Sequence, residues 1–189
     1  MESVESMEDF IFPFPGRELA DQELSYDLCY KKIPERDRSV IVERAWQKGC
    51  QAAREIYEKY KGCMDFKKIL EESGLTVIVK DVDYVAGARR YFSDYVSGKK
   101  TVTLYLKSVQ MWAEQNSLDL AEAENLILCH EYFHFLEMNQ IGRTSKDYQV
   151  PMLKLGPLKI GQTGIHALSE IGAHAFAHTY YCELAERKE

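Results

Sequence analysis

Two histidines four residues apart, His130 and His134, enclose a glutamate in the pattern H-E-x-x-H. Apolar residues from Leu126 to Leu136 surround them, which predicts a buried helix. Residues four apart lie one turn above each other on the same helix face, so both imidazoles can point at one metal ion. Glu131 is rotated by about 100° from His130, so it is directed at a metal-bound water rather than at the metal. This pattern is typical of a zinc hydrolase with two histidine ligands and a glutamate base.

Hydrogen bonding inside the core is the alternative role for these three polar side chains. A nearly apolar helix implies burial, and burying two histidines and a glutamate without partners costs considerable free energy. A bound metal ion would remove that cost, so we expect a metal site here.

A catalytic zinc ion needs a third protein ligand and one open coordination position. The longer pattern H-E-x-x-H-x-x-G-x-x-H would supply a third histidine, but Glu137 and Gln140 stand at those positions. Glu137 shares the histidine face, yet it lies about 10 Å along the helix axis from His130 at 1.5 Å per residue. No glycine lets the chain turn back, so we expect the third ligand to come from another element.

A second helix, predicted from about residue 164 to residue 187, offers that ligand. His166, Glu170, His174 and His178 recur every four residues and form one polar stripe. A single stripe presents one or two residues to one metal. We favour Glu170 as the third ligand, with His174 as its main competitor. The alternative is a solvated helix face, which suits His178 best and then His166.

Two stretches, residues 128–134 and residues 170–177, resemble the ImmA/IrrE-type metallopeptidases. These are small gluzincins, in which a helix with H-E-x-x-H is followed by a second helix that donates a glutamate. The second helix of that family typically reads Glu, two variable residues, Ala, a polar residue, one variable residue and Phe-Ala. The resemblance implies one zinc ion per chain, with Glu131 as base and the ligands His130, His134 and Glu170. It also implies a regulatory peptidase that cuts a protein substrate such as a transcriptional repressor.

This sequence departs from the family pattern at two places. Tyr132 and Phe133 replace the smaller pair that is usual between the two histidines, which could crowd the site. His174 stands where Asn or Asp is common, which could alter the contacts around the metal ligands.

The chemistry that we expect is metal-assisted hydrolysis of a peptide bond. Zinc would lower the pKa of its bound water to about 7 and polarise the scissile carbonyl. Glu131 would take the proton and pass it to the leaving amine. A further donor must stabilise the oxyanion. The sequence does not choose among five candidates for that donor: His166, His174, His178, Tyr148 and Tyr180.

Two other functions use the same residues. The first is a catalytically silent module, with or without zinc, that captures a regulatory partner protein. The second is an iron oxygenase, in which two histidines and one carboxylate bind the metal. Glu131 has no evident task in such an oxygenase, so we rank it below the peptidase.

The composition is that of an ordinary globular protein. The chain has 189 residues, of which 46% are hydrophobic and 29% charged, and this suits one domain with its own core. A net charge of −6 and the lack of a long basic cluster argue against nucleic acid as the direct target. No apolar run approaches the roughly 18 residues of a membrane span, and the start of the chain lacks the basic region of a signal peptide. Five cysteines without a C-x-x-C pair predict reduced thiols in the cytoplasm.

Helical periodicity is clear in several segments. Residues 1–35 are expected to be an irregular arm, because Phe10 to Gly16 contains two prolines and cannot propagate a helix. Apolar residues recur at helical spacing over residues 35–61, and shorter helices are expected over 65–73 and 107–114. The metal helix is expected to start near Asp119, where Asp119 and Glu122 resemble a capping box.

Three segments with a period of two, residues 75–79, 88–96 and 101–106, predict a small antiparallel sheet beside the H-E-x-x-H helix. One edge of that sheet would bind peptide. Residues 140–165, rich in Gly and Pro, are expected to be a long loop that walls the cleft and sets specificity. The predicted fold class is α+β, with the arm over residues 1–35 and a single zincin-like metallopeptidase domain over residues 36–189.

Overall fold

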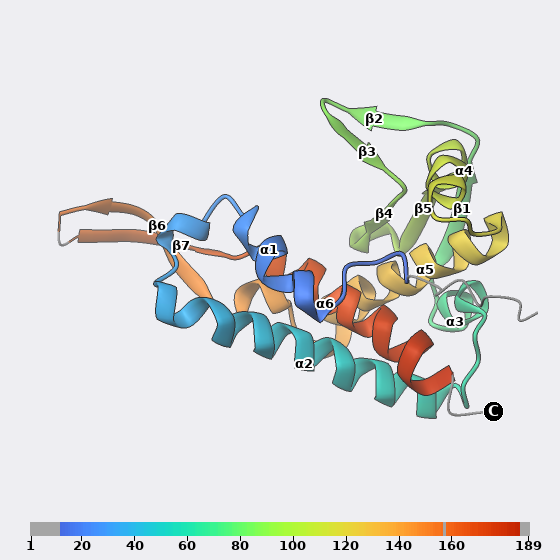
Figure 1. The fold of residues 1–189 in the computed structure, drawn as a ribbon, viewed down its shortest axis with the longest axis horizontal. Helices are drawn as coiled ribbons and strands as arrows, with labels where there is room; N and C mark the ends of the chain where they lie inside the picture. The colour runs from blue at the N-terminus through green and yellow to red at the C-terminus, as the bar shows by residue number, and fades with distance from the viewer. Residues whose placement is uncertain (1–11, 157, 186–189) are drawn as a thin grey trace, which may run out of the picture.

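Three helices form the framework of the fold. The computed structural model describes residues 12–156 and 158–185. The three helices are α2 (Glu35–Lys59), α5 (Leu120–Leu136) and α6 (Ala167–His178). Figure 1 shows a mixed α+β arrangement in which α6 lies along α2, with the small sheet on the far side of α5. The α+β prediction is confirmed at this level.

Two glycines set how closely the three long helices approach one another. A Cβ atom on Gly49 of α2 would collide with the backbone oxygen of Gly172 in α6. A Cβ atom on Gly172 would in turn lie 2.6 Å from Cζ of Phe133 in α5. Glycine at both positions therefore lets α6 sit tightly between α2 and α5, because larger side chains would push the backbones apart.

The helix predictions hold for most segments. The helices α3 (Phe66–Glu72) and α4 (Leu106–Gln115) form where expected. Asp65 caps α3 by accepting a hydrogen bond from the backbone N–H of Lys68 at 3.0 Å. Asp119 caps α5 in the same way through the N–H of Glu122 at 2.8 Å.

The N-terminal segment is more ordered than predicted. Instead of an irregular arm over residues 1–35, the chain forms α1 (Ala20–Ser25) and two 3₁₀ turns at Arg17–Leu19 and Tyr30–Lys32. Ala20, Leu24 and Ile33 are buried in a core cluster shared with α2 and α6. These elements are too short for a helical period to be visible, and burial against the body stabilises them. Phe10 and Ile11 lie outside the described residues.

The sheet differs from the prediction in direction and in extent. Its order is β1-β5-β4, from β1 (Thr76–Lys80), β5 (Thr101–Tyr105) and β4 (Ser93–Val96). The β1–β5 pair is parallel and only β4–β5 is antiparallel, so the all-antiparallel prediction was wrong. The expected strand 88–96 is divided: its first part, β3 (Arg89–Tyr91), pairs instead with β2 (Tyr84–Ala86). This hairpin is the arm at the top of Figure 1. It reverses the chain before β4 and so makes β5 parallel to β1.

The expected loop 140–165 contains a second hairpin. The strands β6 (Gln149–Leu155) and β7 (Leu158–Gly164) pair antiparallel and project from the body at the left of Figure 1. The loop prediction was therefore wrong for this part, because glycines and prolines masked the alternation. Gly156 and Gly161 have positive φ angles of 59° and 66°, which a turn and a strand irregularity require. Among the hairpin residues whose side chains the structure describes, four apolar side chains are exposed: Met152, Leu153, Leu158 and Ile160.

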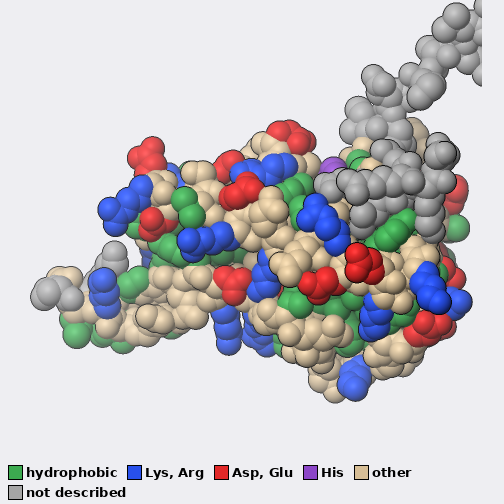
Figure 2. Space-filling model, turned by 90° about the horizontal axis from the view of Figure 1, so that it is seen from below, with side chains coloured by type: hydrophobic (Ala, Val, Ile, Leu, Met, Phe, Trp, Pro, Cys, Tyr) green, Lys and Arg blue, Asp and Glu red, His purple; other side chains and the backbone are tan. Residues whose placement is uncertain are grey.

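The charged side chains are mixed on the face in Figure 2, where Lys and Arg alternate with Asp and Glu. This agrees with the absence of a long basic cluster in the sequence. Among the described helices, none combines the length and the apolar character that a membrane crossing requires.

Candidate metal centre

The helix α5 presents its two histidines to the same side because they lie one turn apart. The helix is buried around most of its circumference, against α3, α4, α6 and the sheet. Its polar residues therefore open into the gap toward α6 and β4. His130 and His134 both remain half-buried there, with side-chain exposures of 12% and 19%.

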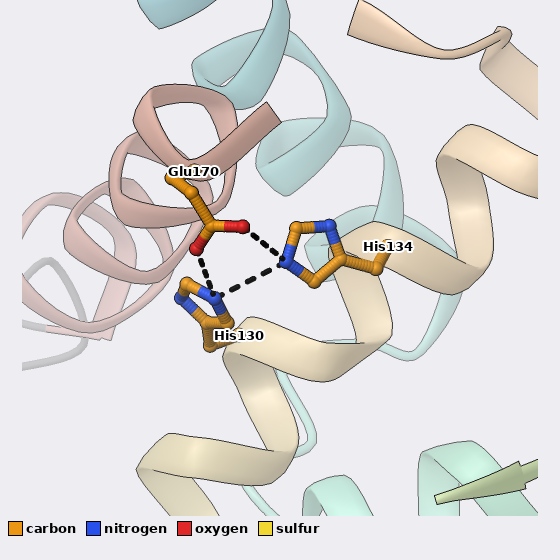
Figure 3. A group of neighbouring side chains, drawn as sticks. All are labelled: His130, His134 and Glu170. Atoms are coloured by element: carbon orange, nitrogen blue, oxygen red, sulfur yellow. Dashed lines mark hydrogen bonds and ion pairs between the residues drawn. The ribbon is translucent and has the colours of Figure 1, made fainter. Parts of the chain in front are cut away.

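Three side chains converge in this gap (Figure 3). The Nε2 atoms of His130 and His134 lie 3.2 Å apart. Glu170 brings Oε2 to 3.4 Å from Nε2 of His130 and Oε1 to 3.6 Å from Nε2 of His134. A tetrahedral zinc ion with ligands at about 2.0–2.1 Å has ligand–ligand edges of about 3.3–3.4 Å. The separations between the two nitrogens, and from each nitrogen to its nearer carboxylate oxygen, are close to those edges, and we call the three side chains the donor triangle.

The position of Glu170 on α6 decides which residue completes the triangle. Among the described residues, His130, His134 and Glu170 form the group of side chains close enough to share one metal ion. His174 lies one turn further along α6 and is not in that group, although its ring centroid is 5.3 Å from that of His130. The geometry therefore favours Glu170 over His174 as third ligand.

Glu131 lies beside the triangle and is held from the sheet. Its side chain is buried, and its Oε1 atom accepts a hydrogen bond from the hydroxyl of Ser93 on β4 at 2.6 Å. Ser93 was not among the residues singled out from the sequence, and no local pattern marks it. Its role depends on β4 lying against α5, which only the three-dimensional arrangement reveals.

Glu137 is the second residue, after Ser93, whose contact with the site was not predicted from the sequence. It is too far along the helix axis to bind the metal, but its Oε2 atom accepts a hydrogen bond from Nδ1 of His134 at 3.0 Å. Its Oε1 atom accepts from the backbone N–H of Thr144 at 2.7 Å and from the hydroxyl of Ser169 at 2.8 Å. A carboxylate cannot donate, so Nδ1 of His134 must carry a proton, and loss of the Nε2 proton would turn the Nε2 lone pair toward the triangle. That tautomer is the one that binds metal through Nε2.

The charges around the triangle shift three pKa values in the metal-free protein. Burial alone lowers the pKa of His134, but the hydrogen bond that it donates to Glu137 and the charges of Glu170 and Glu131 outweigh burial and raise the pKa to about 9. Burial alone raises the pKa of Glu170, but the two histidines of α5 bring it well below its ordinary value. Burial and the neighbouring charge of His130 lower the pKa of His174 to about 3, so that this imidazole is neutral at pH 7.

The five sequence candidates for the oxyanion donor separate into two groups. His174 and His166 line cavities at the triangle. The His166 side chain is 85% exposed, and its Nδ1 atom lies 3.9 Å from Oε1 of Glu170. The remaining three are engaged elsewhere: Nε2 of His178 donates to the backbone oxygen of Phe14 at 2.9 Å, Tyr148 donates to Asp37, and Tyr180 donates to the backbone oxygen of Cys63.

The cleft around the triangle has two different sides. On the α4 side lies a cavity of about 360 Å³ bounded by Phe14, Phe92 and Trp112. On the α1 side lies a cavity of about 970 Å³ whose wall includes Glu23 and Asp27. Both cavities reach His130, Glu131 and Glu170, so the triangle lies between them.

Cys129 is no nucleophile for this cleft. It is fully buried on a different side of α5 from the histidines, and burial raises the pKa of its thiol well above the ordinary value. A protonated, enclosed thiol is a packing residue.

No family model, curated protein or solved structure matches the chain. The functional argument therefore depends on the residues and on their geometry.

Proposed function

We propose that the chain is a zinc-dependent metallopeptidase of the gluzincin type, similar to the ImmA/IrrE metallopeptidases, acting on a protein or peptide substrate. The observation that carries this proposal is the donor triangle of His130, His134 and Glu170, in which the two nitrogens lie 3.2 Å apart and each has a carboxylate oxygen within 3.4 to 3.6 Å. One negative ligand and two neutral ones would leave a zinc site with net charge +1, which is easier to bury than +2. When bound, zinc would supply a water of lowered pKa and polarise a carbonyl.

Glu131 is the base in this proposal. It shares the cleft with the triangle but is not one of its three donors. One of its oxygens accepts from Ser93, which orients the carboxylate. Glu131 would remove a proton from the attacking water and return it to the leaving amine. Of the donors considered for the oxyanion, His174 and His166 border the cleft.

The edge strand β4 offers a place for an extended peptide. It pairs with β5 on one side and is the last strand of its sheet. Ser93 and Tyr95 of β4 line the cavities at the triangle. A substrate that adds to this edge would make backbone hydrogen bonds along β4 and bring a peptide bond to the metal centre. A regulatory protein such as a repressor remains the substrate class that the resemblance suggests.

The decisive variant is Glu131→Gln. A mixture of synthetic peptides of random sequence is incubated with zinc-loaded protein, and new termini are identified by mass spectrometry. The wild type should cut and the variant should not, while both retain zinc and the same circular dichroism spectrum. Cleavage by the variant at the wild-type rate would refute the mechanism.

A catalytically silent module that captures a partner is the second proposal compatible with the triangle. The side chain of Phe14 stacks on the ring of His130 and narrows the approach to the metal centre. Zinc binding without cleavage of any peptide in the mixture would favour this role. Iron in place of zinc after purification would favour the oxygenase alternative.

A further inference from the structure

The first described residues of the chain lie directly over the metal centre. The ring of Phe14 stacks on His130 with centroids 5.4 Å apart and on His174 with centroids 5.7 Å apart. The backbone oxygen of Phe14 accepts a hydrogen bond from Nε2 of His178 at 2.9 Å, which fixes this segment to α6. We call residues 12–15 the N-terminal strap.

The strap closes one side of a pocket that has several aromatic rings in its wall. Phe14 lies 5.4 Å from Trp112 of α4, and Trp112 lies 5.7 Å from Phe92, measured between ring centroids. Together with Ile127 these rings bound the 360 Å³ cavity described above, whose inner end is formed by His130 and Glu131. We call this cavity the strap pocket.

The positive charge of Arg90 in the wall of the strap pocket is already paired with a carboxylate. Arg90 lines the pocket, but its Nε atom is 2.8 Å from Oδ1 of Asp83 in an ion pair outside the pocket. The acidic groups in the wall are Glu131 and Glu170, and both belong to the metal centre. A charged ligand side chain would therefore lose its hydration without gaining an unpaired partner.

We propose that the strap pocket receives an apolar, preferentially aromatic, side chain of the substrate, and that Phe14 is a specificity-determining residue. This inference rests on the proposed function, because the occupant is the residue next to the peptide bond that meets the metal centre. The pocket volume is near the lower end of the roughly 300–1,000 Å³ of ligand pockets, so it holds one large side chain and little more. Aromatic walls favour an aromatic guest through offset and edge-to-face contacts.

The cavity on the α1 side does not impose the same selection. It is larger, at about 970 Å³, and its wall mixes Tyr26 and Leu28 with the carboxylates of Glu23 and Asp27. Side chains of several chemical types fit such a surface. The selective side of the cleft is therefore the one that the strap encloses.

Amino-acid hydroxamates test the proposal without requiring turnover. Each probe carries a zinc-binding hydroxamate next to one side chain, and the series is Gly, Leu, Phe, Asp and Lys. Isothermal titration calorimetry with the zinc-loaded protein gives a Kd for each probe. The Phe probe should bind at least about tenfold more tightly than the Gly probe, and the Asp probe no more tightly than Gly. Equal Kd values for Gly and Phe, or tightest binding of Lys, would overturn the inference.

The variant Phe14→Ala removes one wall of the pocket. It should reduce the ratio of Phe to Gly affinity by about tenfold, measured on protein loaded with zinc to the same content as the wild type. The control is Leu19→Ala, because Leu19 is an exposed apolar residue just after the strap and lines neither of the two cavities beside the metal centre. An unchanged Phe to Gly ratio in Phe14→Ala would contradict the role of the strap.

This experiment distinguishes failure of the metallopeptidase proposal from failure of the strap-pocket inference. Protein that binds no zinc, or no Gly hydroxamate, refutes the metal centre and with it the inference. Protein that binds the Gly hydroxamate without preference for Phe leaves the metallopeptidase proposal standing and refutes only the strap pocket.

Discussion

The carboxylate of Glu137 accepts a hydrogen bond from Nδ1 of His134 at 3.0 Å, three residues away on the same helical path. Its other oxygen is held by the backbone N–H of Thr144 and the hydroxyl of Ser169. Glu137 is thus fixed from three directions and in turn fixes the ring of His134. Partners of this kind orient metal-binding histidines and set their tautomer.

Replacing Glu137 by Gln should therefore weaken zinc binding without removing any ligand. The amide has only one accepting oxygen. It can accept a hydrogen bond from His134, or from Thr144 and Ser169, but not from all three as the carboxylate does. We expect zinc affinity to fall by about 10- to 100-fold, measured by competition with a chromophoric chelator. Glu122→Gln, an exposed change at the start of the same helix, is the matched control. Equal affinities for the two variants would show that Glu137 has no such role.

The raised pKa of His134 makes the stability of the metal-free protein depend on pH. The folded-state pKa is about 9 and the ordinary value is 6.5. Since the folded pKa is higher, protonated His134 stabilises the fold fully below pH 6.5, and this stabilisation is lost as pH rises through about 9. Urea midpoints of chelator-treated wild type should therefore fall more steeply over this range than those of His134→Asn. Parallel pH profiles of the two proteins would contradict the assignment.

The hydroxyl of Ser93 should matter for turnover and not for metal binding. Ser93→Ala removes the hydrogen bond of 2.6 Å to Glu131. Hydrogen bonds to charged groups contribute about 1.5–3 kcal/mol, so we expect peptide hydrolysis to slow by about tenfold or more. Zinc content should not change, and Ser39→Ala on the exposed side of α2 is the control.

The close packing of α2 on α6 should be sensitive to a single methyl group. In Gly49→Ala the new Cβ would meet the backbone of Gly172, which cannot yield as a flexible side chain can. Overpacking of this kind costs about 1–3 kcal/mol, and urea denaturation should report a loss of that size. Gly98→Ala adds a Cβ with no atom within 4 Å and is the control. Unchanged stability of Gly49→Ala would mean that the helices separate without cost.

The sequence predicted helices better than strands for a physical reason. The periods of α2 and α5 are long enough to define a buried face, and the caps at Asp65 and Asp119 mark where helices begin. A period of two identifies an extended segment but not its partner or direction. The parallel pairing of β1 with β5 therefore could not be predicted. The β6–β7 hairpin was missed because its glycines and prolines are typical of loops.

The candidate site was predicted only where its residues share a helix. The spacing of His130 and His134 gave their common face, and the stripe on α6 left Glu170 and His174 as alternatives. Helix geometry excluded Glu137 as a ligand but did not reveal its contact with His134. Phe14 stacks on His130 although the two are far apart in the chain, and no local pattern predicts such a contact.

The zinc content of ligand variants tests the central claim most directly. Wild-type protein purified without added metal and measured by inductively coupled plasma mass spectrometry should contain one zinc per chain. Glu170→Ala and the double variant His130→Ala/His134→Ala should contain none. His174→Ala should keep zinc, with affinity lower by about 10- to 100-fold. Full zinc occupancy in the double variant, or loss of zinc in His174→Ala but not in Glu170→Ala, would contradict the assignment of His130, His134 and Glu170 as the metal ligands.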